Sequence, residues 1–401
     1  MKYEFIGVPR TPQIDALRGF ALLGILIVNI QSMVWGMSGY TLGPLGSDSS
    51  PLDAAIVFIT AFLFEYKFYP LFCFCFGYGF AVQARRWRIQ GLPLRQRYTR
   101  RLAFMLGLGL LHGSLIWFGD ILTRYAFSAC FLYPYLGKGP RTLLKGLKIW
   151  AGLTLVLTLF LAVSNSLLAV DSDPVSLAAA KTAYAQQAQD ILQIYTQGDY
   201  IPIAAQRISD YLEITAGALL YFPELVMLFL AGALTAQMGW LRQPERHRAA
   251  WGRVLRASLA IGIPLNFLYA NQSLAIARGE MPDWGILGAL LPQSGMILSL
   301  AYVAALALIA PTGAGSRLIA GFAPAGKLAL SNYLLQSLIV TTLLYGYGWG
   351  LGATLKQAAL FQLALVVYIT LLIGSHLYLR FYRQGPFEAL WRRYTYAGER
   401  Q

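Results

Sequence analysis

One histidine in the middle of an apolar stretch is the side chain in this sequence best suited to acid–base chemistry. His112 lies in RRLAFMLGLGLLHGSLIWFGDILTRYA, eleven residues after Arg101, or ~17 Å along a helix axis. Imidazole titrates close to neutral pH, and its neutral form can be buried without a charge. We expect a catalytic or substrate-binding role, with a structural hydrogen bond as the alternative. No second histidine follows at three or four residues, so no metal is expected.

Carboxylates on several segments are candidates for orienting this histidine. Asp120 and Arg124 follow His112 where the chain turns back, but a continuous helix would place Asp120 ~12 Å away, too far for a direct hydrogen bond. We therefore expect the orienting acid to come from elsewhere, for example Glu65 or Glu224. The sequence predicts that His112 lines an enclosed cavity in the outer half of the membrane, with Glu65, Asp120 or Arg124 nearby. We take His112, Asp120 and Glu65 as the catalytic candidates.

An acid and an arginine open the first apolar segment, IDALRGFALLGILIVNI. Asp15, Arg18 and Asn29 fall on one helical stripe, because their spacings return to the same face. One interpretation is that Asp15 caps the helix and Arg18 extends to lipid headgroups. The other is that Arg18 binds an anionic ligand. We expect Arg18 to face the protein interior or the mouth of a cavity rather than lipid.

Further polar residues lie in apolar segments, where polar groups are costly and usually functional or paired. The candidates for substrate binding are Asn29, Lys67, Arg124, Glu224, Asn332 and Gln336. Asn332 and Gln336 are four residues apart and therefore share one helix face. Hydrogen bonding between helices is the alternative interpretation for each of the intramembrane polar side chains.

Membrane-spanning helices are the elements that must position these residues. Of the 401 residues, 57% are hydrophobic and only 12% are charged, about half the charged fraction of a typical soluble protein. Windows of about 20 apolar residues predict an all-α, polytopic membrane protein of about ten spans. The spans are 15–36, 68–84, 101–118, 121–137, 143–169, 215–240, 252–271, 284–310, 318–345 and 357–380, and the shorter 52–66 is predicted as a half-helix.

The charges between the spans predict their orientation. Arginine and lysine cluster at 85–101, 138–148, 242–256 and after Leu379, whereas 171–213 is mostly acidic. The positive-inside rule places both termini in the cytoplasm and 171–213 outside, as a helical periplasmic insertion in a single domain over residues 1–401. The rule also accounts for the net charge of +14. The expected partner is therefore the lipid bilayer and not nucleic acid.

Four stretches together resemble the YeiB family of bacterial inner-membrane proteins, whose function is unassigned. They are 14–30, 67–86, 100–126 and 326–338, and the tail GPFEALWRRYTY also resembles the end of that family. The resemblance implies a multi-pass protein of the bacterial inner membrane. At a wider level, the opening D-x-x-R-G helix is similar to that of transmembrane acyltransferases, which include the lysosomal enzyme that acetylates heparan glucosamine.

The wider similarity implies a reaction and a set of roles. Acyl-CoA would be the donor, with Asp15 and Arg18 at the cytoplasmic mouth of its tunnel and Arg97 and Arg101 binding its phosphates. His112 would act as general base or transient acyl carrier. The acceptor would be a glycan or small molecule on the periplasmic side. The sequence is compatible with a monomer and with a homodimer.

A transporter or permease for a small solute is the alternative function. Asn29, His112, Glu224, Asn332 and Gln336 would then line its pathway. The sequence contains none of the dinucleotide-binding, P-loop, zinc-protease or nucleophile-elbow motifs of soluble enzymes. Release of free CoA from acyl-CoA would distinguish the acyltransferase from the transporter.

Overall fold

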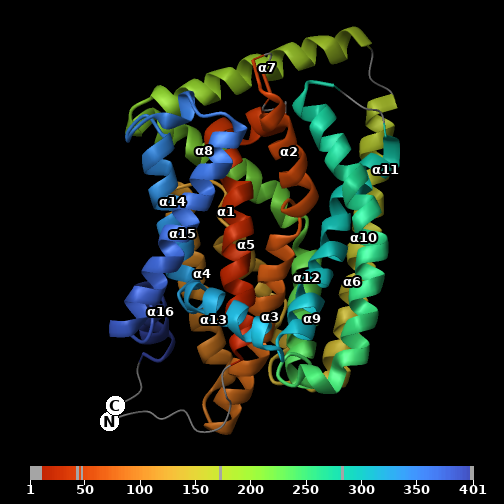
Figure 1. Ribbon diagram of the computed structural model, residues 1–401, viewed down its shortest axis with the longest axis vertical. Helices are drawn as coiled ribbons and strands as arrows, with labels where there is room; N and C mark the ends of the chain where they lie inside the picture. The colour runs from red at the N-terminus through yellow and green to blue at the C-terminus, as the bar shows by residue number, and fades with distance from the viewer. Residues whose placement is uncertain (1–10, 42–44, 47, 171–173, 281–283, 398–401) are drawn as a thin grey trace.

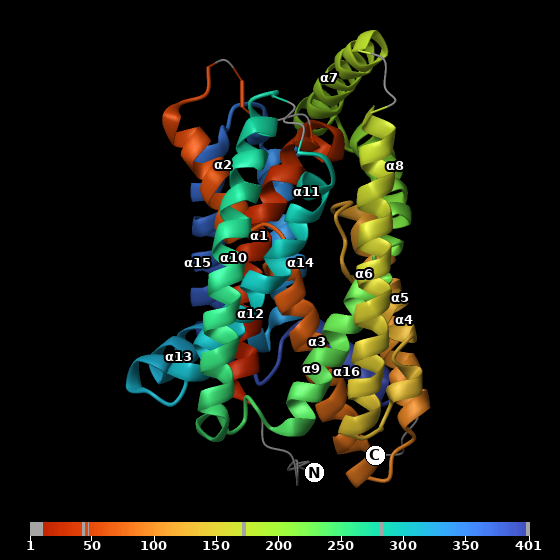
Figure 2. The ribbon, with the colours of Figure 1, turned by 90° about the vertical axis from the view of Figure 1, so that its right-hand side faces the viewer.

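The computed structural model describes residues 11–41, 45–46, 48–170, 174–280 and 284–397 (Figure 1). Every regular element in these residues is a helix, which confirms the all-α prediction. The long helices run side by side along the longest axis, and α7 (Pro174–Gln197) lies across one end of them. The first turn of α1 (Pro12–Thr41) and helix α16 (Pro386–Thr395) lie at the opposite end (Figures 1 and 2).

Six stretches of the described chain are long and apolar enough to cross a membrane, or up to eight if each of two bent helix pairs forms one span. The six are Pro12–Gly36, Pro51–Ile89, Pro140–Leu167, Pro244–Ala277, Gly285–Ile309 and Gln357–Phe381. Length and composition thus support a membrane protein. By this criterion the predicted count of ten spans is not confirmed.

These stretches contain most of the long helices. They include α1, α2 (Pro51–Leu63), α3 (Phe68–Ile89), α6 (Pro140–Val170), α10 (Arg248–Ala277), α11 (Gly285–Leu290), α12 (Ser294–Ile309) and α15 (Gln357–Phe381). The predicted half-helix at 52–66 corresponds to α2, which continues into α3 within one candidate span. Over the segment predicted to lie outside, the structure forms α7 and much of α8 (Tyr200–Leu219), while 171–173 lie outside the described residues.

Two helix pairs are sharply bent. Helices α8 and α9 (Phe222–Met238) meet at 67°, and α13 (Gly313–Lys327) and α14 (Ala329–Leu344) meet at 74°. At the second bend, Asn332 Nδ2 donates to the carbonyl oxygen of Ala325 at 3.1 Å and to Ser375 Oγ at 2.9 Å. The carbonyl at the end of α13 is thereby satisfied. Asn332, a predicted substrate-binding residue, joins α13, α14 and α15.

Helices α4 (Leu94–Leu115) and α5 (Leu122–Cys130) form a hairpin. The helix predicted over 121–137 is shorter than expected, because α5 has nine residues, which is ~14 Å and too short to cross a bilayer. Pro134 follows in a 3₁₀ turn at Tyr133–Tyr135. Proline disfavours helical conformation in the residue before it, so the apolar run cannot continue as one helix.

Helices α1 and α13 touch through two glycines. A β-carbon on Gly19 would lie 2.1 Å from the carbonyl oxygen of Phe322, and one on Gly326 would lie 1.7 Å from that of Asp15. Any larger side chain would push the two helices apart. Glycine at this crossing therefore brings Arg18 of α1 close to the turn between α13 and α14.

Candidate functional site

Helix α4 ends at Leu115, three residues after His112, and the turn that follows it forms one part of the site. The backbone N–H groups of Ile116 and Trp117 both donate to the carbonyl oxygen of His112 at 3.0 Å. The chain then turns and brings Asp120 back, so that its Oδ1 lies 3.0 Å from His112 Nδ1. The predicted ~12 Å separation is wrong, because it assumed a continuous helix and α4 stops at Leu115.

The Asp120 carboxylate is held by the start of α5. The backbone N–H of Thr123 donates to Asp120 Oδ2 at 2.8 Å, as in a helix cap, and Arg124 Nε donates to the Asp120 carbonyl oxygen at 3.1 Å. The Thr123 hydroxyl lies 2.6 Å from the Tyr211 hydroxyl on α8. A carboxylate accepts hydrogen bonds, so Nδ1 of a neutral His112 carries the proton and Nε2 is the basic nitrogen.

Nε2 of His112 has no hydrogen-bond partner among the described residues. The histidine is 1% exposed, and its ring centre lies 5.0 Å from that of Tyr333 and 6.5 Å from that of Trp117. Leaving a buried polar group unsatisfied costs about 1–3 kcal/mol. Native structures contain few such groups, and an unexplained one is a candidate for chemistry.

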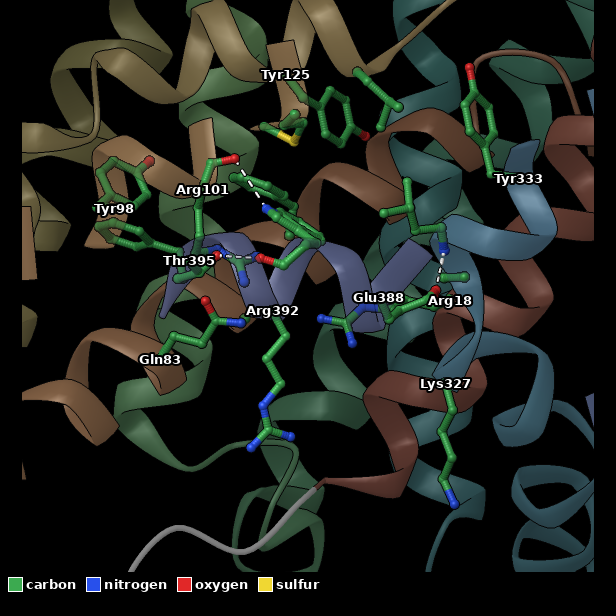
Figure 3. A pocket seen from close by; sticks show the side chains of 18 of the residues that line it. Arg18, Gln83, Tyr98, Arg101, Tyr125, Lys327, Tyr333, Glu388, Arg392 and Thr395 are labelled. Carbon is green, nitrogen blue, oxygen red and sulfur yellow. Dashed lines mark hydrogen bonds between the residues drawn. The ribbon is translucent and has the colours of Figure 1, made fainter. Parts of the chain in front are cut away.

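A cavity of about 310 Å³ lies between α1, α3, α4, α5, α14 and α16. Its charged lining residues are Arg18, Arg86, Arg101, Lys327, Arg392 and Glu388, and its aromatic ones are Phe72, Phe76, Phe80, Trp87, Tyr98, Tyr125, Tyr333, Trp391 and Tyr396. Figure 3 shows Lys327 and Arg392 extending to one side, away from Tyr125 and Tyr333. Such a lining suits a ligand that combines negative charge with apolar or aromatic parts.

Arg18 points into the protein. Its guanidinium donates to Asp15 Oδ1 at 3.3 Å and to the carbonyl oxygen of Cys75 on α3 at 3.1 Å. These contacts confirm the predicted inward orientation of Arg18. They do not fit the alternative interpretation, in which Arg18 extends to lipid headgroups. Asn29, on the same predicted stripe, is half-buried and is not among the cavity-lining residues.

Two of the predicted donor-binding arginines pack against α16. The Arg101 guanidinium lies 3.9 Å from the centre of the Trp391 ring, and that of Arg97 lies 4.3 Å from the centre of the Tyr396 ring. Trp391 Nε1 also donates to the Arg101 carbonyl oxygen at 3.1 Å. These cation–π contacts attach the C-terminal helix to α4 and close one side of the cavity.

Glu65 and Lys67 belong to a different cluster. Glu65 Oε2 accepts a hydrogen bond from the Tyr269 hydroxyl at 2.5 Å, and Lys67 Nζ donates to the carbonyl oxygen of Ala61 at 2.5 Å. Both side chains join the turn between α2 and α3 to its surroundings. The expectation that Glu65 or Glu224 orients His112 is wrong, because the turn after α4 delivers a nearer acid.

The remaining predicted polar residues are also dispersed. Glu224 accepts a hydrogen bond from the Tyr69 hydroxyl, and Asn332 serves the α13–α14 bend. Gln336 is 1% exposed, and its Oε1 has no partner in the described part of the chain. None of these three lines the cavity described above, and His112 does not line it either. The prediction that His112 itself lines a cavity is not borne out by this cavity, although Tyr333, which packs on the His112 ring, does line it.

Most of the cavity wall contributed by α14 and α16 was not predicted from the sequence. Glu388 Oε1 accepts from the backbone N–H groups of Leu330 and Ser331 at 2.8 and 3.1 Å, and thus caps α14 from another helix. The lining residues of α16 are Glu388, Trp391, Arg392 and Thr395, and Tyr396 follows directly after the helix. Their three- and four-residue spacing marks one helix face, a signal present in the tail.

Gly109 allows the Asp120 turn to approach α4, which leads to a prediction. A β-carbon there would lie 2.6 Å from Thr123 N and 2.7 Å from Asp120 Oδ2, whereas one on Gly107 meets nothing within 4 Å. We expect Gly109→Ala to destabilise the fold by about 1–3 kcal/mol, as overpacking does, and to lower the thermal unfolding midpoint. The matched Gly107→Ala should leave the midpoint unchanged or raise it. Equal midpoints for the two variants would contradict the close approach.

Fold and site define a class: a helical membrane protein with a buried histidine–aspartate pair and a basic, aromatic cavity at one end. The family model "Protein of unknown function (DUF418)" matches residues 235–398. The chain belongs to this family of YeiB-like proteins, which confirms the resemblance found in the sequence.

Two relatives cover nearly the whole chain. The chain is 33% identical over 409 residues to the uncharacterized protein YxaH of Bacillus subtilis (strain 168), covering 98% of this chain and 94% of YxaH. It is 29% identical over 401 residues to the uncharacterized protein YeiB of Escherichia coli (strain K12), covering 96% of each. No solved structure is significantly similar.

Proposed function

We propose that this protein is a membrane-bound acyltransferase that moves an acyl group from acyl-CoA to a hydroxyl or amine acceptor. The observation that carries the proposal is the His112–Asp120 pair, in which Asp120 engages Nδ1 at 3.0 Å and Nε2 has no described partner. An imidazole oriented in this way is suited to act as a general base. Its neighbour Tyr333 also lines the cavity.

The charges of the cavity support an anionic donor. Arg18, Arg101, Lys327 and Arg392 can form charge-assisted hydrogen bonds to phosphates, and the aromatic side chains of the lining offer surfaces for a base. Phe72, Phe76 and Leu122 line the same cavity and suit an apolar acyl chain. A donor placed with its phosphates at Lys327 and Arg392 would direct its thioester toward Tyr333 and His112.

The proposed step is acyl transfer with His112 as base. Nε2 takes the proton of the acceptor, and the acceptor oxygen or nitrogen attacks the thioester carbonyl carbon. The new C–O or C–N bond forms as the C–S bond breaks, and the imidazolium returns its proton to the departing CoA sulfur. Asp120 stabilises the imidazolium in between. Because Tyr333 packs on the His112 ring, its displacement would open the path from the cavity.

The proposed topology has both termini in the cytoplasm and lies in the bacterial inner membrane. The eight candidate spans, counting both bent pairs, would cross it, and the hairpin of α4 and the short α5 would enter the membrane and return to the same side. Successive passes then alternate in direction, and the arginine-rich connections lie at one end. The donor cavity would open to the cytoplasm, and α7 would lie on the periplasmic side, where a glycan or small-molecule acceptor would enter.

Cysteine labelling checks this topology. In a Cys130→Ser background, which removes the exposed native thiol, Gln187→Cys on α7 should react with a membrane-impermeant maleimide added to intact cells. The matched variant Gln243→Cys, exposed near the opposite end, should react only after the membrane is opened. The reverse pattern would contradict the proposed orientation.

Release of CoA tests the function. Inverted inner-membrane vesicles containing this protein, with their native acceptors, are incubated with acetyl-CoA or a long-chain acyl-CoA. Free CoA is quantified by mass spectrometry, because a thiol dye would also react with exposed Cys130. We expect release above that of vesicles carrying His112→Gln. Equal release would contradict the proposal, and solute flux without CoA release would favour a transporter.

A further inference from the structure

A second cavity, of about 270 Å³, lies between α3, α6 and α9, and the function proposed above does not use it. Its charged lining residues are Arg85, Arg88, Lys138 and Arg242. No aspartate or glutamate is among the described residues that line it. We propose that this cavity binds the phosphate-bearing headgroup of an anionic membrane lipid.

No residue in the described part of the chain neutralises these four cations. Within the described residues none of them forms a hydrogen bond through its side chain or an ion pair. Cations gathered around one hollow repel one another, and a bound phosphate would relieve that repulsion. The Arg88 guanidinium is set against Gly137, where a β-carbon would lie 2.5 Å from its Nη2. Glycine at that turn thus lets Arg88 lie close to the start of α6.

Part of the cavity lining is apolar, which suits the upper part of a lipid. Ala81 and Ala84 of α3 are buried, and Val82 and Ala236 complete this part of the lining. The uncharged polar side chains of the lining are already paired: the Tyr78 hydroxyl lies 3.1 Å from Thr11 Oγ1, and Gln237 Nε2 donates to the Lys138 carbonyl oxygen at 2.7 Å. A free phosphate would make no use of the apolar surface, whereas the glycerol and upper acyl chain of a lipid would cover it.

The level of the cavity matches that of lipid phosphates. Helix α3 ends at Ile89, α6 begins at Pro140 and α9 ends at Met238, so three helices end around it. The ends of apolar spans lie at the boundary between hydrocarbon and headgroups. Basic pockets between helices at this level bind anionic headgroups.

Helix α6, which begins at the cavity, is largely exposed along its side. Only 17% of the most apolar window within Pro140–Leu167 is buried in the protein, so most of α6 faces outward, and Figure 2 shows α6 along one side of the molecule. A lipid diffusing in the leaflet can therefore reach the start of α6 without crossing other helices. Entry from the leaflet favours a lipid over a soluble anion.

Native mass spectrometry of the detergent-purified full chain tests the proposal. Phosphatidylglycerol and phosphatidylcholine are titrated separately, and glycerol 3-phosphate serves as the soluble probe of the same phosphate chemistry. We expect phosphatidylglycerol to bind the native protein, and we expect Arg88→Gln/Arg242→Gln to weaken this binding about 25-fold, because each basic residue contributes a factor of about five. The matched control, Arg253→Gln/Arg256→Gln on α10, removes two exposed arginines that do not line the cavity and should change binding less than twofold.

Three results would overturn the proposal. Equal weakening by the two double variants would mean that general surface charge attracts the lipid. Equal binding of phosphatidylcholine would mean that the anionic headgroup is not recognised. Tight binding of glycerol 3-phosphate, lost in Arg88→Gln/Arg242→Gln, would assign the cavity to a soluble phosphate compound.

All four altered arginines are exposed, so their replacement should not disturb the fold. Unchanged thermal unfolding midpoints would show that both double variants fold. None of these outcomes depends on acyl transfer.

Discussion

Replacing His112 by glutamine is expected to lower kcat for acyl transfer by about 10²–10⁴-fold, the usual contribution of a general base. The side chain of glutamine can still donate a hydrogen bond to Asp120, but its amide cannot take a proton from the acceptor. KM for acyl-CoA should stay within about threefold, because the cavity-lining arginines are untouched. Initial rates of CoA release at several donor concentrations measure both quantities.

His376→Gln provides the matched control for this variant. His376 is exposed on α15, and its Nε2 lies 2.9 Å from the Gly321 carbonyl oxygen. It should keep native kcat and KM. A thermal unfolding midpoint of His112→Gln within a few degrees of the native value would show that the fold survives. Full activity in His112→Gln would overturn the proposed mechanism.

Asp120→Asn is expected to reduce kcat by a similar factor, roughly 10²–10⁴-fold, with little change in the fold. The asparagine can still accept from Thr123 N through its oxygen, which keeps the cap of α5. Its NH₂ group would then face His112 Nδ1 and require that nitrogen to accept. The proton of the neutral ring would move to Nε2, where it blocks the base.

The position of the imidazole proton separates this explanation from structural damage. In protein labelled with ¹⁵N-histidine, NMR should show the proton on Nδ1 in the native protein and on Nε2 in Asp120→Asn. The control Asp190→Asn changes an exposed acid on α7, which accepts from Gln186 Nε2 at 3.0 Å, and should alter neither the tautomer nor kcat. An unchanged tautomer with lost activity would contradict the role assigned to Asp120.

Local chemistry accounts for what could be predicted from the sequence. Apolar length dictated helices, because a buried backbone must satisfy its own hydrogen bonds, and the all-α fold followed. The inward orientation of Arg18 could be predicted because Asp15 and Asn29 share its stripe at helical spacing. His112 could be identified as a candidate because a titratable group in an apolar segment is costly to bury and is usually functional or paired. Each of these inferences depends on one segment at a time.

Tertiary structure decided which of these groups meet. Helical periodicity describes a residue only while the helix continues, so it could not place Asp120 once α4 stopped at Leu115. The choice of Asp120 over Glu65 depends on Gly109, which lets the turn approach α4. The contribution of α16 depends on contacts across about 290 residues of chain, such as Trp391 with Arg101. Sequence alone determined the helical fold and singled out Arg18 and His112. The site itself arose where helix ends and glycines allowed distant segments to touch, because packing between segments is set by their joint shape and not by local spacing.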